Sequence, residues 1–259
     1  MITVHCLVKN EENFIWYAIN SVLPYVEKIL VWDTGSTDRT AEIIKTVKSP
    51  KIEFEEKGKV DRNAFAKLRQ EMVDKTKTDW IMILDGDEVW WDEAIRSLAA
   101  KLSSRQADFD LVVSPCYMAV GDIFHYQEES AGRYQIYNRR GHFNIRFIRN
   151  LSGLKVHGFY GNEGYSDSRG RKLQNFPKEK IFFSDEKYLH LSHLLRSSKS
   201  KSKYKYELGA AFPKDFYYPE VFFRPCPEIV PSPWKSMTNS YKLLASIGTP
   251  MKKIKRRIT

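Results

Sequence analysis

Cysteine is scarce in this chain, and its three copies lie far apart. Cys6, Cys116 and Cys226 form no CxxC pair, so the sequence supports neither a disulfide framework nor a zinc cluster. Long apolar runs are also missing, because the stretch Trp80–Leu84 is far shorter than the ~18 residues of a membrane span. The first residues, MITVHCLVKNEEN, lack the basic and apolar regions of a secretory signal. We therefore expect a soluble protein of the cytoplasm.

Two phosphate-binding signatures are absent as well. Neither GxxxxGK[ST] nor GxGxxG occurs, which excludes P-loop kinases and Rossmann dehydrogenases. Cys116 and Cys226 belong to no Cys-His-acid constellation, so a thiol nucleophile is not expected. What is present is apolar material: 42% of the 259 residues are hydrophobic and 14% are aromatic, which excludes a disordered chain and supplies the core of one large domain.

The positive charge is concentrated in two short segments. Lys and Arg total 42 against 32 Asp and Glu, a net charge of +10. Residues 196–205 and 251–259 each carry five of these cations and no acid, which leaves 32 charges of each sign elsewhere. Such segments suit substrate phosphates, an anionic membrane surface or nucleic acid. They are equally typical of a solvated lysine face and a frayed tail.

The first 110 residues alternate strand and helix patterns with short connections. Strands are predicted at Ile2–Val8, Lys28–Asp33, Lys51–Glu55 and Asp79–Leu84, and helices at Phe14–Leu23, Ala41–Val47, Asp61–Thr76 and Asp92–Ser103. Repeated strand-helix units of this kind form a parallel sheet covered by helices. We therefore predict an α/β fold with a mostly parallel central sheet.

After about residue 108 the pattern changes, because no regular helix follows. Strands are predicted at Asp108–Met118, Phe143–Asn150, Leu154–His157 and Tyr188–Leu191. The connections Gly121–His142 and Gly158–Lys180 are long and polar, as functional loops usually are. Residues 206–259 are rich in proline and aromatic side chains and are predicted to be an irregular extension with a basic tail.

Polar clusters follow three of the predicted parallel strands: Lys9–Glu12, Asp33–Ser36 and Asp85–Glu88. Ligands bind at this edge of a parallel sheet. Acidic residues at the end of an apolar strand are costly unless they are paired or bound to a cation. Asp85 and Asp87 are separated by one glycine, so both carboxylates can face one Mg²⁺ or Mn²⁺ ion. The alternative is a plain Asp-Gly turn.

The blocks CLVKNEEN, ILVWDTGSTDRTAEI and DWIMILDGDEVW, in this order and spacing, resemble the family-2 inverting glycosyltransferases of the GT-A fold. The likeness is close over residues 1–100 and looser to about residue 200. It implies a nucleotide-diphosphate-sugar donor, first of all a UDP-sugar, a divalent cation (Mn²⁺ or Mg²⁺) and inversion at the anomeric carbon. On this resemblance, residues 1–110 form the donor-binding half of a GT-A domain, and residues 111–205 form its acceptor-binding half. Residues 206–259 remain an extension.

The resemblance also implies contacts to the donor. The residues expected to line the nucleotide are Val8, Asn10, Glu11, Asp33 and Asp85. Asp33 would contact the nucleobase, and Asp85 would lie by the ribose and diphosphate, while Asp87 would bind the metal. Arg69, followed by Gln70, takes a helix position that the family writes Arg-Asn. Arg62 is a second candidate there, and surface charge is the alternative role for both arginines.

The acceptor hydroxyl needs a general base, typically Asp or Glu, after the metal motif. In related enzymes this segment often has a strand followed by His-Glu. Here His157 matches the histidine and is expected to contact substrate, but Gly158 follows it, and the nearest acid is Glu163. Glu163 is therefore the candidate base, with Asp167 and then Asp122 behind it.

Two histidines, His190 and His193, lie at the end of a predicted strand. Related enzymes often have a histidine here that completes the metal shell or touches the diphosphate. Imidazole suits Mn²⁺ better than Mg²⁺. Their odd spacing sends the two rings to opposite faces of a strand, so we expect one to be functional and favour His190. Two purely structural histidines are the alternative. Arg146 and Arg149 would face phosphates or an exposed sheet face.

The predicted function is metal-dependent transfer of a sugar to an acceptor hydroxyl. The basic segments and the aromatic extension favour a large anionic acceptor, either a surface glycan or a lipid-linked saccharide at the inner membrane. The second candidate is a hydroxylated base in viral DNA, which would first have to be flipped out of the duplex. Nucleotidyl transfer and non-catalytic binding of a nucleotide sugar are more distant alternatives. Nucleotidyl transfer would need a basic or glycine-rich loop near the first strand to bind a triphosphate, and the segment Lys9–Glu12 is too acidic for this.

Overall fold

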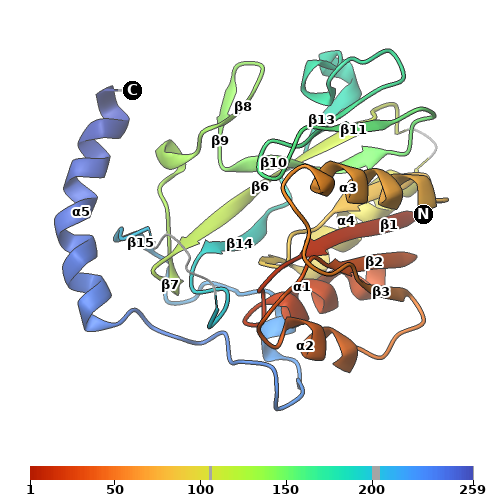
Figure 1. Ribbon diagram of the computed structural model, residues 1–259. Helices are drawn as coiled ribbons and strands as arrows, with labels where there is room; N and C mark the ends of the chain where they lie inside the picture. Colours follow the sequence, from red (N-terminus) through yellow and green to blue (C-terminus); the bar gives the residue numbers. More distant parts are fainter. Residues whose placement is uncertain (105–106, 200–204, 259) are drawn as a thin grey trace.

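The computed structural model describes residues 1–104, 107–199 and 205–258 (Figure 1). Its main sheet has eleven strands among these residues, in the order β15-β7-β6-β10-β4-β1-β2-β3, with β5, β13 and β14 joined at its side. The predicted α/β fold is confirmed. Residues 1–110 and 111–205 both contribute strands to this one sheet.

The first part of the sheet is parallel, as predicted. Its elements are β1 (Ile2–Val8), α1 (Ile15–Val22), β2 (Lys28–Asp33), α2 (Thr40–Thr46), β3 (Ile52–Glu56), α3 (Ala64–Lys75), β4 (Trp80–Ile83), β5 (Glu88–Trp90) and α4 (Asp92–Ser103). Strands β4, β1, β2 and β3 pair in parallel, so their carboxyl ends meet at one edge.

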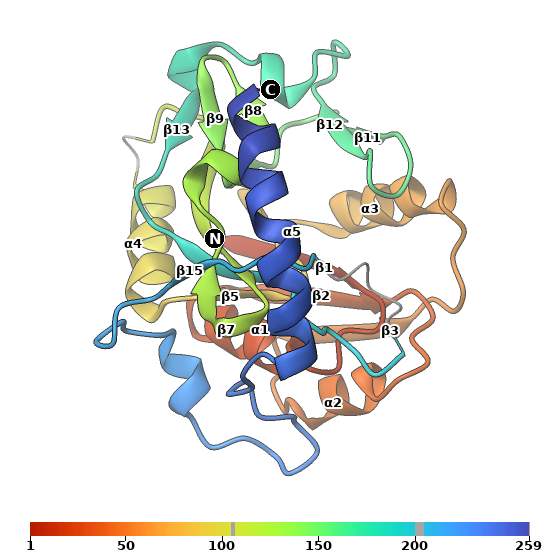
Figure 2. The same cartoon turned by 90° about the vertical axis from the view of Figure 1, so that its left-hand side faces the viewer.

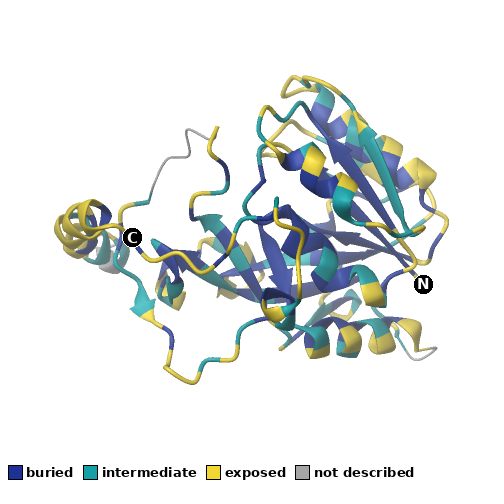
Figure 3. Cartoon of the chain, turned by 90° about the horizontal axis from the view of Figure 1, so that it is seen from below, coloured by how far each residue is buried: buried dark blue, intermediate teal, exposed yellow. Residues whose placement is uncertain are grey.

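Side chains alternate between the two faces of this sheet. On β1, Val4 and Cys6 join the core beneath α1, α2 and α4, whereas Leu7 packs with Phe65 and Met72 of α3 on the other face. In Figure 3 the strands are dark blue along most of their length, and the helices are yellow on their outward sides. The domain thus has three layers: α1, α2 and α4 on one face of the sheet, the sheet itself, and α3 on the other face. Apolar residues at strand and helix spacing explain this arrangement.

The second part of the sheet is mixed. Its elements are β6 (Leu111–Val120), β7 (Asp122–Tyr126), β8 (Tyr134–Ile136), β9 (Arg139–Gly141), β10 (Phe143–Arg149), β11 (Lys155–His157), β12 (Gly164–Ser166), β13 (Ile181–Phe183), β14 (Tyr188–His193) and β15 (Ala210–Ala211). Strand β10 runs antiparallel between β4 and β6. Strand β14 pairs with β6 and, antiparallel, with β5, which places it beside the turn that follows β4.

The long polar connections contain more regular structure than predicted. Strands β7, β8 and β9 lie within Gly121–His142, and β12 lies within Gly158–Lys180. These strands have three to five residues each, too few for the alternation of polar and apolar residues to be recognised. Short 3₁₀ turns lie at Leu23–Tyr25, Glu129–Ala131, Leu173–Asn175, Lys178–Lys180 and Glu220–Phe223.

The C-terminal extension is irregular only in its first part. It packs on the domain, where Arg224 pairs with Asp92 and the Tyr17 hydroxyl donates to the Pro231 carbonyl. From residue 239 the prediction of an irregular segment is wrong, because α5 (Asn239–Ile258) is a helix of 20 residues. Pro250 lies inside this helix, and prolines are uncommon inside helices, so the proline-rich composition did not indicate one. Figures 1 and 2 show α5 beside the β7–β9 region.

None of the helices in the described part of the chain is long and apolar enough to span a bilayer.

Candidate active site

A cavity of about 760 Å³ lies at the carboxyl edge of the parallel strands. The side chains around it come from the ends of β1, β4 and β14, from α3 and from the loop between β11 and β12. The lining residues of interest are Val8, Asn10, Glu11, Thr34, Arg62, Arg69, Asp85, Asp87, Tyr160, Glu163, His190, Ser192 and Arg196. Most of the predicted site residues therefore meet in one place.

The loops after β1 and β2 hold each other at this edge. The backbone N–H of Asn10 donates to the Ser36 hydroxyl at 2.8 Å, and the N–H of Thr37 donates to Asn10 Oδ1 at 2.8 Å. The N–H of Glu11 donates to the Thr40 hydroxyl at 2.8 Å. Two of the predicted polar clusters thus form one interlocked surface.

The glycine between Asp85 and Asp87 has a structural reason. A Cβ atom at Gly86 would lie 2.8 Å from Cγ of Glu11, which is closer than side chains approach. The acidic turn after β4 can therefore pack against the β1 loop only when this residue is glycine. This contact brings the third polar cluster against the first.

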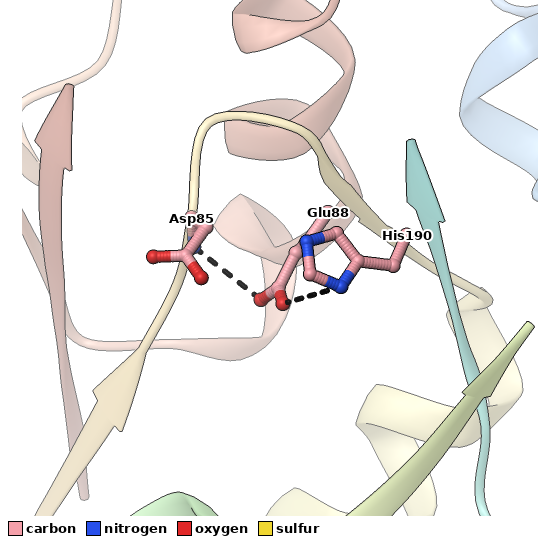
Figure 4. Close-up of side chains that lie close together, drawn as sticks. All are labelled: Asp85, Glu88 and His190. Atoms are coloured by element: carbon pink, nitrogen blue, oxygen red, sulfur yellow. Dashed lines mark hydrogen bonds and ion pairs between the residues drawn. The ribbon is translucent and has the colours of Figure 1, made fainter. Parts of the chain in front are cut away.

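Pairing of β14 with β5 brings a histidine to the acidic turn. In the register of these strands His190 lies opposite Glu88. Ligand atoms of Asp85, Glu88 and His190 all lie within 4.8 Å of one another (Figure 4). His190 Nδ1 is 3.7 Å from Glu88 Oε1, and His190 Nε2 is 3.5 Å from Asp87 Oδ1. The imidazole thus lies between two carboxylates.

Asp87 is almost fully buried, with 2% of its surface exposed. Its second oxygen, Oδ2, is 3.5 Å from Nη1 of Arg196, which also contacts Glu11 Oε1 at 2.5 Å. Burial favours the neutral acid, but the neighbouring His190 and Arg196 outweigh it and lower the pKa of Asp87. Burial disfavours a charged imidazole at His190, yet Asp87 raises the pKa of His190 well above its usual value.

Two buried arginines offset the remaining acids. Arg146 on β10 donates to Asp85 Oδ2 at 3.1 Å and to Glu88, and its Nε donates to the Tyr188 hydroxyl at 3.1 Å. Burial nevertheless raises the pKa of Glu88 to about 7. Arg69 lies 3.9 Å from Asp85 and 3.8 Å from Glu163, and its buried Nε and Nη1 have no hydrogen-bond partner among the described residues. The site therefore holds donors that a bound ligand can satisfy.

Nine of the residues predicted to form the site line this cavity. They are Val8, Asn10, Glu11, Arg62, Arg69, Asp85, Asp87, Glu163 and His190. Asp33 lies beside the cavity wall formed by Thr34. Its Oδ1 accepts from the N–H groups of Gly35 and Ser36 at 2.7 Å each, and its buried Oδ2 has no partner among the described residues.

Four other candidates do not line the cavity. Asp167 pairs with Arg171 at 3.1 Å, and Asp122 binds the His125 ring at 2.6 Å, so both carboxylates already have partners. His157 lies on β11 outside the cavity. The predicted opposite orientation of the two histidines holds, because His193 borders a different cavity. Asp122, His157 and His193 lie on strands and Asp167 follows β12, and residue type alone does not reveal which way these elements face.

Several residues of the site carried little signal in the sequence. Glu88 belongs to the third polar cluster, but only its pairing with β14 shows its buried position. Arg196 is the first cation of the basic segment 196–205, of which residues 200–204 lie outside the described residues. Tyr160 faces Phe65 with ring centroids 4.8 Å apart and receives a hydrogen bond from Arg62 to its carbonyl at 3.3 Å. The one feature of the sequence that pointed to Arg196 was its position as a cation just after the strand that carries His190 and His193.

Comparison with known sequences points to one family. A family model described as "Glycosyl transferase family 2" matches residues 3–160. The SPbeta prophage-derived glycosyltransferase SunS of Bacillus subtilis (strain 168) is 35% identical over 118 residues, which cover 44% of this chain and 26% of that protein. SunS of Bacillus phage SPbeta matches with the same values. The chain thus spans about a quarter of the length of these curated relatives.

Two solved structures show a weaker likeness. TarS 1–349 of S. aureus has a TM-score of 0.49 at 15% identity, covering 74% of this chain and 60% of that one. The glucosyl-3-phosphoglycerate synthase of Mycobacterium tuberculosis, in complex with Mn²⁺, UDP and glucosyl-3-phosphoglycerate, has a TM-score of 0.36 at 21% identity, covering 47% and 45%. These scores are too low for a residue-by-residue comparison, so the sequence match carries the family assignment.

The buried pairing of Arg146 with Glu88 leads to a stability prediction. Arg146→Met leaves the Glu88 carboxylate buried without its partner, which we expect to lower the free energy of unfolding by about 3–5 kcal/mol. Adding Glu88→Leu should recover most of this loss, because both charges are then gone. Urea unfolding of the single and double variants measures it. Arg149→Met, on the same strand but partly exposed, is the control and should cost less. A double variant no more stable than Arg146→Met would contradict the pairing.

Proposed function

The chain belongs to glycosyl transferase family 2, and from this premise we propose that it transfers a sugar from a nucleotide-diphosphate sugar to an acceptor hydroxyl. The observation that carries the proposal is the meeting of Asp85, Asp87, His190 and Arg196 around one cavity at the carboxyl edge of the sheet. Such an edge binds nucleotides in α/β folds. We further propose that transfer requires a divalent metal and inverts the anomeric carbon.

The nucleoside would bind along the loops after β1 and β2. Val8, Asn10 and Glu11 line this part of the cavity. Asp33 supports a contact to the base, because its buried Oδ2 has no partner among the described residues and can accept an N–H group. Arg62 lies at the cavity rim and would face the nucleotide. We propose a UDP-sugar as the donor.

A metal fits best between Asp87 and His190. Both side chains line the cavity, as does Asp85, which offers a ligand atom within 4.8 Å of one of His190. Glu88 also lies near His190, but it does not line the cavity and is engaged by Arg146. Oxygen ligands with one imidazole suit Mn²⁺ better than Mg²⁺. A bound metal would offset the negative charge that develops on the leaving diphosphate. Arg196, 3.5 Å from Asp87, would support the same charge.

Glu163 is the acid best placed to act as general base. It lines the cavity beside Arg69, and its Oε2 accepts the backbone N–H of Gly161 at 2.6 Å. These contacts orient the carboxylate and leave Oε1 toward Arg69. A base that takes the proton of the acceptor hydroxyl supports direct displacement, which inverts the anomeric carbon. Asp167 is less suited as a general base, because its carboxylate already accepts hydrogen bonds from the Arg171 side chain and from two backbone N–H groups.

Helix α5 favours an acceptor at a membrane surface. Leu243, Leu244, Ile247, Met251 and Ile254 are 48–71% exposed and share one side of the helix. The opposite side is buried on the domain through Tyr241, Ala245 and Thr249. Residues 239–258 contain six Lys and Arg and no acid. An exposed apolar stripe beside cations is typical of helices that lie on anionic lipid.

Two other partners fit this helix less well. DNA would leave the apolar stripe uncovered, and a second copy of α5 would bring two cationic helices together without acids to pair them. We therefore propose that the protein works in the cytoplasm, peripheral to the inner membrane, on a lipid-linked saccharide or surface glycan.

The donor site is tested by calorimetric binding of UDP, GDP, CDP and TDP with and without Mn²⁺. We expect UDP to bind best and only with the metal. Asp87→Asn should weaken this binding at least about tenfold, because a metal ligand is lost. Asp185→Asn, the same substitution at an exposed position, is the control and should change it less than about twofold. Binding of no nucleotide, or equal binding without metal, would contradict the proposal.

The base is tested by hydrolysis of the preferred nucleotide sugar, with water as acceptor. Glu163→Gln should slow hydrolysis by about 10²–10⁴-fold while nucleotide binding is kept, because a general base contributes that much. Asp167→Asn, four residues away and outside the cavity, should keep the wild-type rate. NMR of the first sugar released from an α-linked donor should show the β anomer. Release of the α anomer would rule out inversion.

Membrane contact is tested by sedimentation with vesicles of phosphatidylglycerol or phosphatidylcholine. The wild type should bind the anionic vesicles. Ile247→Glu should lower this binding about tenfold or more, because burying one isoleucine contributes roughly 1.5–3 kcal/mol. Ser246→Glu adds the same charge outside the apolar stripe and should lower binding less than about threefold. Equal losses in the two variants would show that charge alone matters and would exclude the stripe as the contact.

A further inference from the structure

A second cavity, of about 380 Å³, lies between α5 and the body of the domain. Figure 2 shows the helix crossing in front of β7, β8 and β9, the region from which this cavity receives several of its walls. Five Lys and Arg side chains and two histidines line it. No Asp or Glu is among its lining residues in the described part of the chain.

The nearest buried acid does not neutralise this charge. Glu207 is 2% exposed, and both of its oxygens are bound by Arg256, at 2.6 and 2.7 Å. Gln127 donates a further hydrogen bond to it at 2.8 Å. Arg256 therefore binds the Glu207 carboxylate directly, while Lys205 is close enough to interact with its charge. This single acid faces five Lys and Arg side chains. Lys205 and Arg133 have no ion pair with a carboxylate among the described residues.

Lys205 is held by neutral groups. Its Nζ lies 3.1 Å from Nε2 of His193 and 3.4 Å from Oε1 of Gln127. An ammonium group can only donate, so His193 accepts with a neutral ring. Burial, followed by the charge of Lys205, lowers the pKa of His193 to about 3. Burial also lowers the pKa of Lys205; Glu207 opposes this effect, and Arg256, Lys252 and Arg133 add to it. Cations gathered in this way repel one another unless an anion binds between them.

The cavity adjoins the proposed active site. His193 borders it, while the preceding residue, Ser192, lines the donor cavity. The Ser192 hydroxyl lies 3.3 Å from Sδ of Met118, which also lines the cationic cavity. A single strand, β14, therefore separates the two cavities. A ligand in the second cavity lies on the far side of β14 from the nucleotide site.

We propose that this cavity binds a phosphate group of the acceptor, with Lys205, Arg133 and Lys252 as the residues that hold it. This inference rests on the proposed function. Phosphate has oxygen acceptors on every side and suits a cavity whose walls offer mainly donors. A metal ion is excluded for His193 here, since the lining offers no carboxylate. Two kinds of ligand share this chemistry: a soluble sugar phosphate and a lipid that carries a phosphate.

The first experiment measures calorimetric binding of inorganic phosphate and glucose 1-phosphate to the full chain at fixed ionic strength. We expect Lys205→Ala to weaken binding about tenfold or more, because a hydrogen bond to a charged group contributes about 1.5–3 kcal/mol. Lys253→Ala removes the same charge from α5, but Lys253 pairs with Glu128 at 2.5 Å and does not line the cavity. This control should change binding less than about twofold.

A second arm uses vesicles that contain phosphatidic acid. Binding that Lys205→Ala weakens in solution identifies a soluble phosphate, and a loss confined to vesicles identifies a lipid phosphate. If neither arm shows binding that depends on Lys205, or if Lys253→Ala causes an equal loss, the inference is overturned. UDP binding with Mn²⁺, measured on the same variants, should stay unchanged. Its absence in the wild type would instead count against the proposed donor site.

Discussion

The site depends on the charge balance around Arg146. Three carboxylates, Asp85, Asp87 and Glu88, follow within one turn after β4, and Glu88 and Asp87 are almost fully buried. Such a turn is unstable without a compensating charge, because desolvated carboxylates repel one another. Arg146 reaches two of them from β10, so the antiparallel insertion of β10 beside β4 is what makes the acidic turn possible. Asp87 is left facing His190, Arg196 and the cavity.

The two cavities differ in charge, and β14 lies between them. Five Asp and Glu and five Lys and Arg line the first cavity, whereas five Lys and Arg and no acid line the second among the described residues. On one side its His190 faces carboxylates, and on the other side its His193 accepts from Lys205. Burial acts on both rings, but their neighbours decide the result: the pKa of His190 is raised and that of His193 is lowered. One strand thus presents the same residue type to an acidic environment on one side and to a basic one on the other. The pairing of this strand with both β5 and β6 fixes the two environments relative to each other.

The sequence predicted the donor half far better than the rest. Strands β1 and β2 and helix α4 have the predicted bounds, because apolar periodicity and helix-start residues are local signals. The cavity also needs contacts between distant segments, such as Arg196 with Glu11, 185 positions apart, which no periodicity reveals. Asp167 and His157 were plausible by residue type, but neither lines the cavity: the Asp167 carboxylate pairs with Arg171, and His157 is the last residue of β11. Helix α5 was missed because its segment is rich in proline and aromatic side chains, although Tyr241, Ala245 and Thr249 recur at helical spacing.

The family match covers the first part of the chain. The match ends at residue 160, so it includes the acidic turn and the loops proposed to bind the nucleotide. His190, Arg196 and α5 lie beyond it, whereas the cationic cavity takes residues from both sides of this limit: Arg133 and His142 lie within the match, and His193, Lys205 and Arg256 lie beyond it. The segments after residue 160 therefore carry features that the family match does not cover. Because α5 presents an apolar stripe outward and cations inward, one helix carries the surface proposed to contact the membrane and also lines the cavity proposed to bind phosphate. On these two proposals, acceptor recognition and membrane position would be coupled through α5.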